Sequence, residues 1–259
     1  MSSAIADMRT ITLSNNKGGS GKTTTTVSLA AAFGELGLRI LVIDLDPQGS
    51  TTRWLGQEEA PTGLVEFSRG GMRVADLVVE TTAPEVDLVP TSASLVAQEE
   101  NQETNTGMAI VRSFARLPDY WDLILIDTPP AVGYLSLAPL VVSDHVVIPV
   151  ETHALAISGL VSVVDSIQRA RQRVNTQLNL LGILPCRVNA TLHAREIVVR
   201  LRQEFGDGVL QSQIRESIRV AEAPAFRMPI TRYAPTSRNA EDYRAAAAEI
   251  LVRLGDFRS

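Results

Sequence analysis

One glycine-rich segment near the N-terminus limits the folds that this chain can adopt. Residues 15–26 read NNKGGSGKTTTT; a short apolar run, Arg9–Ser14, precedes them, and a helical pattern extends from Thr23 to Leu36. A glycine turn between a buried strand and a helix brings backbone N–H groups and the helix N-terminus to one point, where they can bind an anion. The segment therefore predicts an α/β fold with a phosphate site at the end of its first strand.

The spacing of this segment matches only the second half of the phosphate-binding loop G-x-x-x-x-G-K-[ST]. Gly21, Lys22 and Thr23 occupy the last three positions, whereas Asn16 stands where the first glycine belongs. Lys17 follows Asn16 and gives the loop a second lysine. The segment is therefore either a phosphate loop that has lost a glycine or a different kind of binding loop that needs two lysines.

Both lysines of the chain lie in this loop. Of the 24 basic residues, all except Lys17 and Lys22 are arginines. An ammonium is a compact, rotatable donor, whereas a guanidinium is a planar one, so the two contact phosphate oxygens differently. The retention of lysine at these two positions favours a role for both against phosphate.

The loop predicts a site for a nucleoside triphosphate and magnesium. Lys22 is placed to bridge the β- and γ-phosphates, the Thr23 hydroxyl to bind Mg²⁺, and Thr24 to reach the α-phosphate. The glycines would direct their N–H groups at the β-phosphate. A glycine turn with two lysines by chance is the alternative, which the strand context and the spacing disfavour. The candidate nucleotide-binding residues of the loop are Lys17, Gly18, Gly19, Ser20, Gly21, Lys22, Thr23 and Thr24.

Three acidic residues end two further predicted strands. Asp127 closes the run LILID, and Asp44 and Asp46 end the run LVIDLD. Because side chains alternate along a strand, Asp44 and Asp46 point to the same side. Parallel strands bind ligands at their carboxyl ends, so these acids are expected beside the loop. A solvated strand end would explain any one of them alone.

Short apolar runs alternate with helical patterns along the chain, which is typical of a parallel sheet covered on both faces. We expect an α/β fold with a mostly parallel, twisted sheet of about seven or eight strands flanked by helices on both faces, in one domain over residues 1–259. Gln57–Gly71 is the most loop-like stretch, and Gln98–Thr106 is expected at the surface. The predicted strands are Arg9–Ser14, Arg39–Asp46, Val86–Thr91, Asp122–Pro130, His145–Val150, Leu181–Asn189 and Val209–Ile214. The predicted helices are Thr23–Leu36, Leu155–Arg173, Ala194–Phe205 and Asn239–Leu254.

Composition excludes several classes of protein. No apolar run approaches the ~18 residues of a membrane span, and Met1–Arg9 lacks the apolar core of a secretory signal. The single cysteine, Cys186, excludes an internal disulfide and a cysteine-based metal cluster. We therefore expect a cytoplasmic protein.

Charge is distributed unevenly along the chain. The net charge is −5, but residues 1–130 carry 9 basic against 17 acidic residues, and residues 131–259 carry 15 against 12. Between Arg187 and Arg238 there are 9 arginines and 5 acids. A basic region on an acidic protein can still follow nucleic-acid phosphates.

Three segments together resemble the ParA/MinD family of ATPases. NNKGGSGKTTTTVSLAAAFGELGLRILVIDLDPQGSTT is similar to the deviant Walker A and A′ motifs of that family, and LILIDTPP is similar to its Walker B motif. VAEAPAFRMPI…YAPTSRNAEDYRAAAAEIL, from Val220 to Leu251, resembles the C-terminal region of ParA. The first two motifs are specific to the superfamily, and the third favours ParA within it. The resemblance extends from about Arg9 to about Leu251, nearly the whole chain.

The resemblance assigns roles at the phosphate site. Lys17 matches the signature lysine, which crosses to the partner's nucleotide in an ATP-sandwich dimer. Asp46 matches the residue that positions the attacking water, while Asp44 falls near the Mg²⁺ shell and Asp127 holds Mg²⁺ through water. The catalytic residues implied are Lys17, Lys22 and Asp46, and the metal-binding residues are Thr23, Asp44 and Asp127.

The purine contacts are less well matched. Arg219 corresponds to a family arginine beside the nucleotide. The family often reads Pro-Arg-Asn where this chain reads Arg215-Glu216-Ser217, so Ser217 occupies the position of the asparagine that contacts the purine. Arg219 and Ser217 complete the expected nucleotide-binding set.

The resemblance implies a slow, partner-stimulated ATPase. A ParA-type protein binds MgATP, forms a homodimer, binds DNA without sequence preference and is released by ParB-stimulated hydrolysis, which drives chromosome or plasmid partition. Such a protein is cytoplasmic and nucleoid-associated. The DNA-binding residues expected here are Arg195, Arg200, Arg202, Arg227 and Arg232, each of which alone is also typical of a solvated helix.

Other members of the superfamily define the alternatives. One alternative is a ParA-like protein that positions another cargo, since such proteins share the DNA-binding cycle. Another alternative is a nucleotide-binding regulator with little hydrolysis. A MinD-like membrane ATPase would carry a basic amphipathic C-terminal helix, whereas the tail EDYRAAAAEILVRLGDFRS is alanine-rich and mixed in charge. We also expect no helix-turn-helix domain ahead of the first strand, and no membrane partner.

Overall fold

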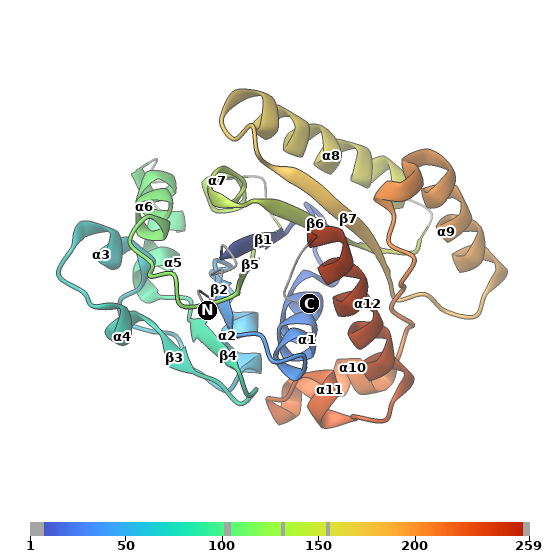
Figure 1. Cartoon of the computed structure of the whole chain (residues 1–259), viewed down its shortest axis with the longest axis horizontal. Helices are drawn as coiled ribbons and strands as arrows, with labels where there is room; N and C mark the ends of the chain where they lie inside the picture. The colour runs from blue at the N-terminus through green and yellow to red at the C-terminus, as the bar shows by residue number, and fades with distance from the viewer. Residues whose placement is uncertain (1–7, 101–104, 131–132, 154–155, 256–259) are drawn as a thin grey trace, which may run out of the picture.

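A seven-stranded sheet forms the centre of the molecule. A computed structural model describes residues 8–100, 105–130, 133–153 and 156–255, and its strand order is β3-β4-β2-β5-β1-β6-β7 (Figure 1). All neighbouring strands run parallel except β3, which pairs antiparallel with β4. The strands are β1 (Arg9–Leu13), β2 (Ile40–Asp44), β3 (Val79–Glu80), β4 (Val86–Val89), β5 (Leu123–Asp127), β6 (His145–Glu151) and β7 (Asn179–Cys186). The predicted mostly parallel sheet is confirmed.

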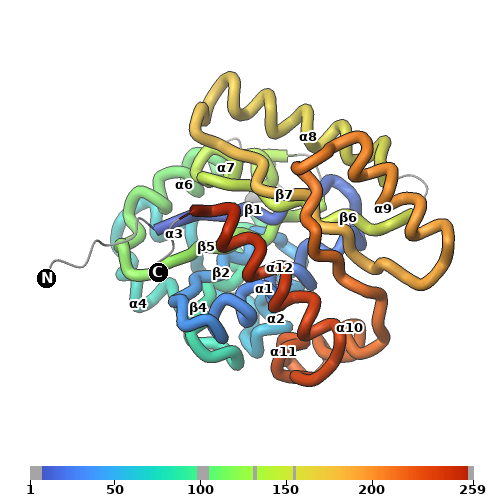
Figure 2. The backbone as a smooth tube through the Cα atoms, turned by 45° about the vertical axis from the view of Figure 1, so that its right-hand side comes forward, coloured from blue at the N-terminus to red at the C-terminus, as the bar shows by residue number. Residues whose placement is uncertain are grey.

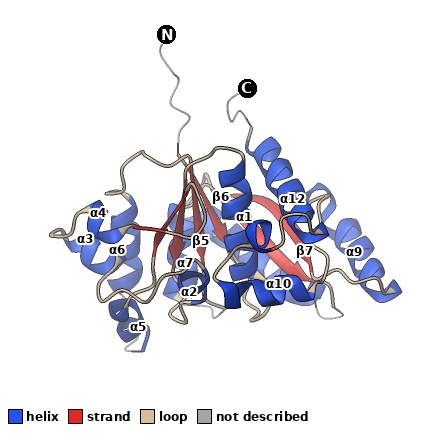
Figure 3. Ribbon diagram, turned by 90° about the horizontal axis from the view of Figure 1, so that it is seen from below, coloured by secondary structure: helices blue, strands red, loops and turns tan. Residues whose placement is uncertain are grey.

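Helices cover both faces of this sheet (Figure 3). The longer helices are α1 (Lys22–Glu35), α6 (Asn105–Phe114), α7 (Tyr134–Val142), α8 (Ala156–Arg173), α9 (Leu192–Phe205) and α12 (Arg238–Leu254). The shorter ones are α2 (Ser50–Trp54), α3 (Leu64–Arg69), α4 (Val74–Leu77), α5 (Ala93–Glu100), α10 (Ile218–Glu222) and α11 (Ile230–Tyr233), with 3-10 turns η1 (Gly206–Gly208) and η2 (Ala223–Phe226). Among the described residues, no helix is long and apolar enough to cross a membrane.

The strands are apolar on both sides because each side has its own helical layer. In β2, Ile40 and Val42 pack with α1 and α12, whereas Leu41 and Ile43 pack with α3 and α6. Figures 1 and 2 both show α12 lying beside α1. The C-terminal helix therefore uses its apolar side, which includes Tyr243, within the core.

The strand order gathers distant parts of the chain at one edge. β5 lies between β2 and β1, and Asp127 pairs in register with Asp44 on one side and with Leu13 on the other. The glycine-rich loop begins directly after β1. As expected for parallel strands, the loop and the acids of β2 and β5 thus meet at the carboxyl edge.

The predicted strand Val209–Ile214 is wrong. Single bridges join Val209 to Ile183 and Arg215 to Val188, and no continuous ladder forms between them. The segment instead lies along β7 with Leu210 packed on Gly182, while the polar residues Gln211 and Gln213 are exposed. Backbone hydrogen bonds from Leu210 to Ile183 and from Ile214 to Pro185 join the segment to β7, but they do not form the continuous ladder of a strand.

Other boundaries also differ from the sequence prediction. β7 ends at Cys186 because Arg187 adopts a left-handed conformation with φ 52°. The stretch expected as a loop at Gln57–Gly71 contains α3, whose Leu64, Val65 and Phe67 are buried. The short β3 gave no recognisable apolar pattern. Part of the polar stretch Gln98–Thr106 lies outside the described residues.

The close packing of Leu210 on β7 predicts the effect of a single methyl group. A Cβ atom at Gly182 would lie 2.8 Å from Cδ2 of Leu210, a side chain that is fully buried. Because that side chain has no room to move, Gly182→Ala should lower the free energy of unfolding by about 1–3 kcal/mol. Urea denaturation followed by circular dichroism measures the change.

Gly159→Ala is the matched control. Gly159 lies in α8 with no atom within 4 Å of an added Cβ, so the same substitution should stabilise the protein by about 0.5–1 kcal/mol. Equal effects of the two substitutions would contradict this description of the packing.

Candidate nucleotide-binding site

The glycine-rich loop is shaped to present its backbone to an anion. Gly19 and Gly21 have φ values of 76° and 91°, a region that favours glycine, and α1 begins at the next residue, Lys22. The first turn of α1 contains no acidic residue. The N–H groups and the positive end of the helix dipole are therefore not neutralised by an acidic residue of the same turn.

Asn15 anchors the loop to the neighbouring strand. Its Nδ2 donates to the carbonyl of Pro149 in β6 at 2.8 Å, and its Oδ1 accepts from the N–H of Lys17 at 3.0 Å. The side chain of Asn15 thus fixes the path of the chain one residue before Asn16, which stands where other phosphate loops have their first glycine. The loop is intact, and its first residues are held by a different contact.

The two lysines of the loop have different surroundings. Lys22 is only 7% exposed, and its Nζ donates to the carbonyl of Lys17 at 3.4 Å. Burial lowers the pKa of Lys22, while the charges of Asp127 and Asp46 raise it. Lys17 is exposed, and its Nζ contacts Nε2 of His153, the residue two positions after β6.

Three carboxylates lie at the strand ends, as the sequence predicted. Asp127 accepts hydrogen bonds from the hydroxyls of Thr23 and Thr51, each at 2.7 Å. Asp44 accepts from the N–H of Thr52 at 2.8 Å and from its hydroxyl at 2.7 Å.

Asp46 is tied to the same cluster. Its N–H donates to Asp44 at 3.1 Å, and its own carboxylate accepts from the N–H of Gln48 at 2.9 Å. Asp44 therefore orients the segment that carries Asp46.

The cluster holds more buried negative than positive charge. Burial together with the charge of Asp127 raises the pKa of Asp44 to about 7. Burial also raises the pKa of Asp127, which the hydroxyls of Thr51 and Thr23 and the charge of Lys22 oppose. Lys22 alone does not balance three acids, so the cluster fits an added cation.

A magnesium ion held partly by phosphate suits this donor set. In the described part of the chain, no three His, Cys, Asp or Glu side chains converge as a complete metal cage. Mg²⁺ commonly takes one or two protein ligands and completes its shell with substrate phosphates and water. The hydroxyl of Ser20, buried in the loop, also lacks a hydrogen-bond partner within the described structure, as expected if a ligand oxygen supplies it.

A cavity of about 470 Å³ continues from the loop toward α10. Its lining includes Gly19, Gly21 and Thr24 of the loop and α1, and Glu216 and Ser217 before α10. Apolar side chains line the space between, as suits the faces of a nucleoside. These apolar residues are Trp54, Ile214, Ile218, Val220, Ala221 and Pro224.

Of the two expected purine-side residues, only Ser217 lines this cavity. Its hydroxyl accepts from the N–H of Arg219 at 3.2 Å and caps α10. Arg219 is exposed and is not among the lining residues.

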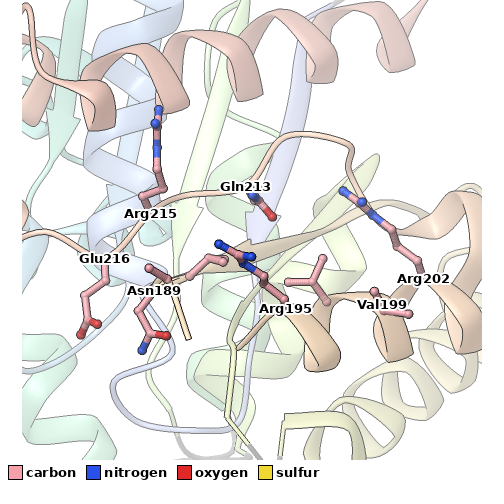
Figure 4. Close-up of a pocket in the computed structure, with 10 residues that line it drawn as sticks. Asn189, Arg195, Val199, Arg202, Gln213, Arg215 and Glu216 are labelled. Atoms are coloured by element: carbon pink, nitrogen blue, oxygen red, sulfur yellow. The ribbon is translucent and has the colours of Figure 1, made fainter. Parts of the chain in front are cut away.

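The arginines expected to contact DNA do not form one patch. Arg195 and Arg202 on α9 line a second cavity, of about 600 Å³, with Val199 (Figure 4). Arg200 is exposed on the same helix, but at five residues from Arg195 it projects in another direction.

Arg227 and Arg232 lie elsewhere on the molecule. Arg227 pairs with Glu58 at 3.1 Å, and Arg232 donates to the carbonyl of Thr82 at 2.7 Å. Arg227 also lines a cavity that includes Thr23 and Thr24 of the phosphate loop. Arg227 therefore belongs to the surroundings of the phosphate loop, and Arg232 is bound to the backbone of another segment.

Several residues of the site were not found from the sequence. Thr51 and Thr52 stand in the quoted segment PQGSTT, but nothing in their spacing assigned them to Asp127 and Asp44. Asn15 precedes the position compared with glycine, and no role was assigned to it from the sequence. His153 follows a strand and showed no motif, and only the fold brings it to Lys17.

Comparisons with known proteins agree with this geometry. A family model described as an AAA domain matches residues 8–180. The chromosome-partitioning ATPase Soj of Thermus thermophilus is 36% identical over 253 residues, which cover 96% of this chain and 98% of the relative. The chromosome partitioning protein ParA of Caulobacter vibrioides is 32% identical over 261 residues, or 96% of each protein. Cobyrinic acid a,c-diamide synthase from Mycobacterium smegmatis, solved with bound ADP and magnesium, has a TM-score of 0.82 and 29% identity over 97% of each chain.

The raised pKa of Asp44 predicts a pH dependence of stability. The folded protein binds this proton up to about pH 7, whereas the ordinary value is 3.8, so protonation stabilises the fold at low pH and this contribution is lost as the pH rises toward 7. In EDTA, Asp44→Asn should therefore unfold at higher urea than wild type at pH 8, by roughly 1–3 kcal/mol. The difference should shrink as the pH falls toward 4.

Asp76→Asn serves as the control for loss of one carboxylate. Asp76 is an exposed residue whose pKa is lowered by its hydrogen bond with Arg73, so this variant should not gain stability at pH 8. A pH-independent difference between Asp44→Asn and wild type would contradict the buried, protonated state of Asp44.

Proposed function

The chain belongs to the ParA/Soj family of P-loop ATPases, and we propose that it is a partitioning ATPase. In this proposal, residues 1–259 act as one ATPase domain that binds MgATP and pairs face to face with a second copy. The ATP-bound dimer holds DNA without sequence preference and releases it after hydrolysis stimulated by a ParB-like partner. The observation that carries the proposal is the loop itself, in which Lys22 is buried near Asp127 and Asp46 and Lys17 is exposed.

The loop would bind the triphosphate through its backbone and Lys22. The N–H groups of the loop and of the first turn of α1 are directed at the phosphates, and the buried ammonium neutralises their charge. Thr24 and Ser217 line the same cavity, where they would contact the α-phosphate and the base.

Thr23 and Asp127 are the residues that would hold magnesium, with Asp44 behind them. The hydroxyl of Thr23 already lies 2.7 Å from Asp127, so both groups point at one place. When bound, the ion supplies positive charge against the phosphoryl oxygens. Both oxygens of Asp44 accept hydrogen bonds from Thr52 and Asp46, so this acid would act on the ion through its charge and its support of the neighbouring segment.

Asp46 would position the water that attacks the γ-phosphate. Its carboxylate is held by Gln48, and its charge acts on Lys22. Catalysis of phosphoryl transfer depends mainly on such positioning and on charge stabilisation. Lys17, reaching from the partner subunit, would add the second positive charge.

Arg195 is the strongest candidate for DNA contact. It is exposed on α9 and lines the second cavity, which shares Arg215 and Glu216 with the nucleotide cavity. A change in that shared wall on nucleotide binding would reach α9 directly, which supports a coupling of ATP state to DNA affinity. The cellular place proposed is the nucleoid, and the cargo is a chromosome or a plasmid.

Asp46→Ala tests the catalytic assignment. The variant should still bind ATP and dimerise, because phosphate binding depends on the loop, but phosphate release should fall at least about 100-fold. Light scattering with ATP and a phosphate-release assay measure the two properties. Asp76→Ala removes an exposed carboxylate and should match wild type in both. Normal turnover of Asp46→Ala would remove this residue from the reaction.

Arg195→Glu tests the DNA surface. Reversal of one phosphate-binding charge per subunit should weaken retention of random DNA with ATP by about tenfold at low salt and reduce the slope of log affinity against log salt. Arg171→Glu, on the exposed last turn of α8, is the matched control and should bind as wild type does. Equal loss in both variants would indicate a general charge effect, and no loss in Arg195→Glu would place the DNA contact on other residues.

A further inference from the structure

We propose that His153 is a positioning residue for Lys17. It holds the ammonium of this lysine on its own subunit and thereby sets how readily ATP-bound subunits pair. The inference rests on the proposed dimer, in which Lys17 leaves its own subunit for the nucleotide of the second copy. His153 is not part of the phosphate site and had no role assigned by sequence.

The end of β6 holds the loop at two points. The backbone carbonyl of Pro149 accepts from the side chain of Asn15 at 2.8 Å, which fixes the start of the loop. Two residues after the strand, Nε2 of His153 contacts Nζ of Lys17. The backbone of His153 is itself fixed, since its N–H donates to Glu151 at 3.0 Å and its carbonyl accepts from Ala156 at 2.9 Å.

The nearby carboxylate does not compete for this lysine. Glu151 lies two residues before His153, but it pairs with Arg187 at 2.9 Å, and Arg187 also pairs with Glu216 at 3.2 Å. The imidazole is therefore the group that receives Lys17. Because an ammonium has only donors, Nε2 must act as the acceptor, which requires the neutral ring with its hydrogen on Nδ1.

The contact with His153 opposes the movement of Lys17 to the nucleotide of the second subunit. In the proposed dimer, Lys17 reaches away from its own subunit to a phosphate of the second copy, so pairing would first break its contact with His153. A single exposed contact of this kind corresponds to a factor of about three to ten in an equilibrium constant. A two-fold symmetric dimer releases two such lysines, so the factors multiply to about 10–100 in the dimer dissociation constant.

The contact also lies close to the nucleotide cavity. Glu216 lines that cavity and is linked through Arg187 to Glu151 at the end of β6. The same strand end therefore borders the cavity wall on one side and holds Lys17 on the other. A nucleotide that displaces Glu216 would therefore shift Arg187 and Glu151 and weaken the contact between His153 and Lys17.

Substitution of His153 tests the inference. His153→Ala and His153→Phe both remove the acceptor, and the second keeps a ring in place should the first disturb the fold. With a non-hydrolysable ATP analogue, both should tighten the dimer about 10- to 100-fold, as measured by sedimentation equilibrium. His153→Gln retains an acceptor oxygen and should stay within about threefold of wild type.

Two further measurements separate positioning from structural damage. Binding of the analogue to the monomer, followed by the fluorescence of Trp54 in the cavity, should be the same in all His153 variants. In a Lys17→Ala background, His153→Ala should have no effect on pairing, because the group that it releases is gone. A gain that persists without Lys17 would overturn the inference.

The outcomes distinguish this inference from the proposed function. If wild type pairs with the analogue and His153→Ala shows no gain, the role of His153 is overturned while the dimer stands. If neither wild type nor His153→Ala pairs at any protein concentration accessible, both are overturned. If only the His153 variants pair, both are supported, with His153 restraining the wild-type protein strongly.

Discussion

The rest of the site depends on two buried aspartates, Asp44 and Asp127, which lie side by side on adjacent strands. Asp44 and Asp127 end adjacent strands in register, and both are buried. Such a pair is costly in a low-dielectric interior unless hydrogen bonds and positive charge offset it. Threonine hydroxyls and Lys22 offset part of this cost. The pKa of Asp44 is still raised, so the negative charge of the pair is not fully balanced. The site is therefore pre-organised for a cation and its phosphate ligands.

The main features of this site could be predicted from the sequence because they are local. A glycine turn after an apolar run and acids at the ends of buried strands are each readable within a few residues, and the parallel sheet brings them together. Thr51, Thr52 and His153 could not be found in this way, since a threonine or histidine in a loop has many uses. Their roles depend on which strand lies next to which, information that only the folded chain contains.

The dependence on the folded chain also explains why composition did not show where the arginines lie or that one expected strand does not form. The region Arg187–Arg238 is rich in arginine, but folding divides these residues between α9, ion pairs such as that of Arg227 with Glu58, and hydrogen bonds to backbone carbonyls such as that of Arg232 with Thr82. Helix periodicity further separates Arg200 from Arg195. In the same region Val209–Ile214 has the composition of a strand, yet Leu210 packs on Gly182 and the neighbouring polar residues stay exposed. The number of charged or apolar residues in a segment does not show which partner each side chain has in the folded protein.

The two lysines show how one loop can hold two kinds of positive charge. Lys22 is surrounded by acids of its own subunit, so its charge is committed to the local phosphate site. Lys17 stands five residues away on the exposed side of the loop, where the imidazole of His153 contacts it in place of a carboxylate. A strong ion pair at that position would hold the lysine too firmly for it to act elsewhere, and no contact would leave it unplaced. In the proposed dimer, a weak acceptor at the end of β6 would place this charge in the monomer and still release it to the second subunit.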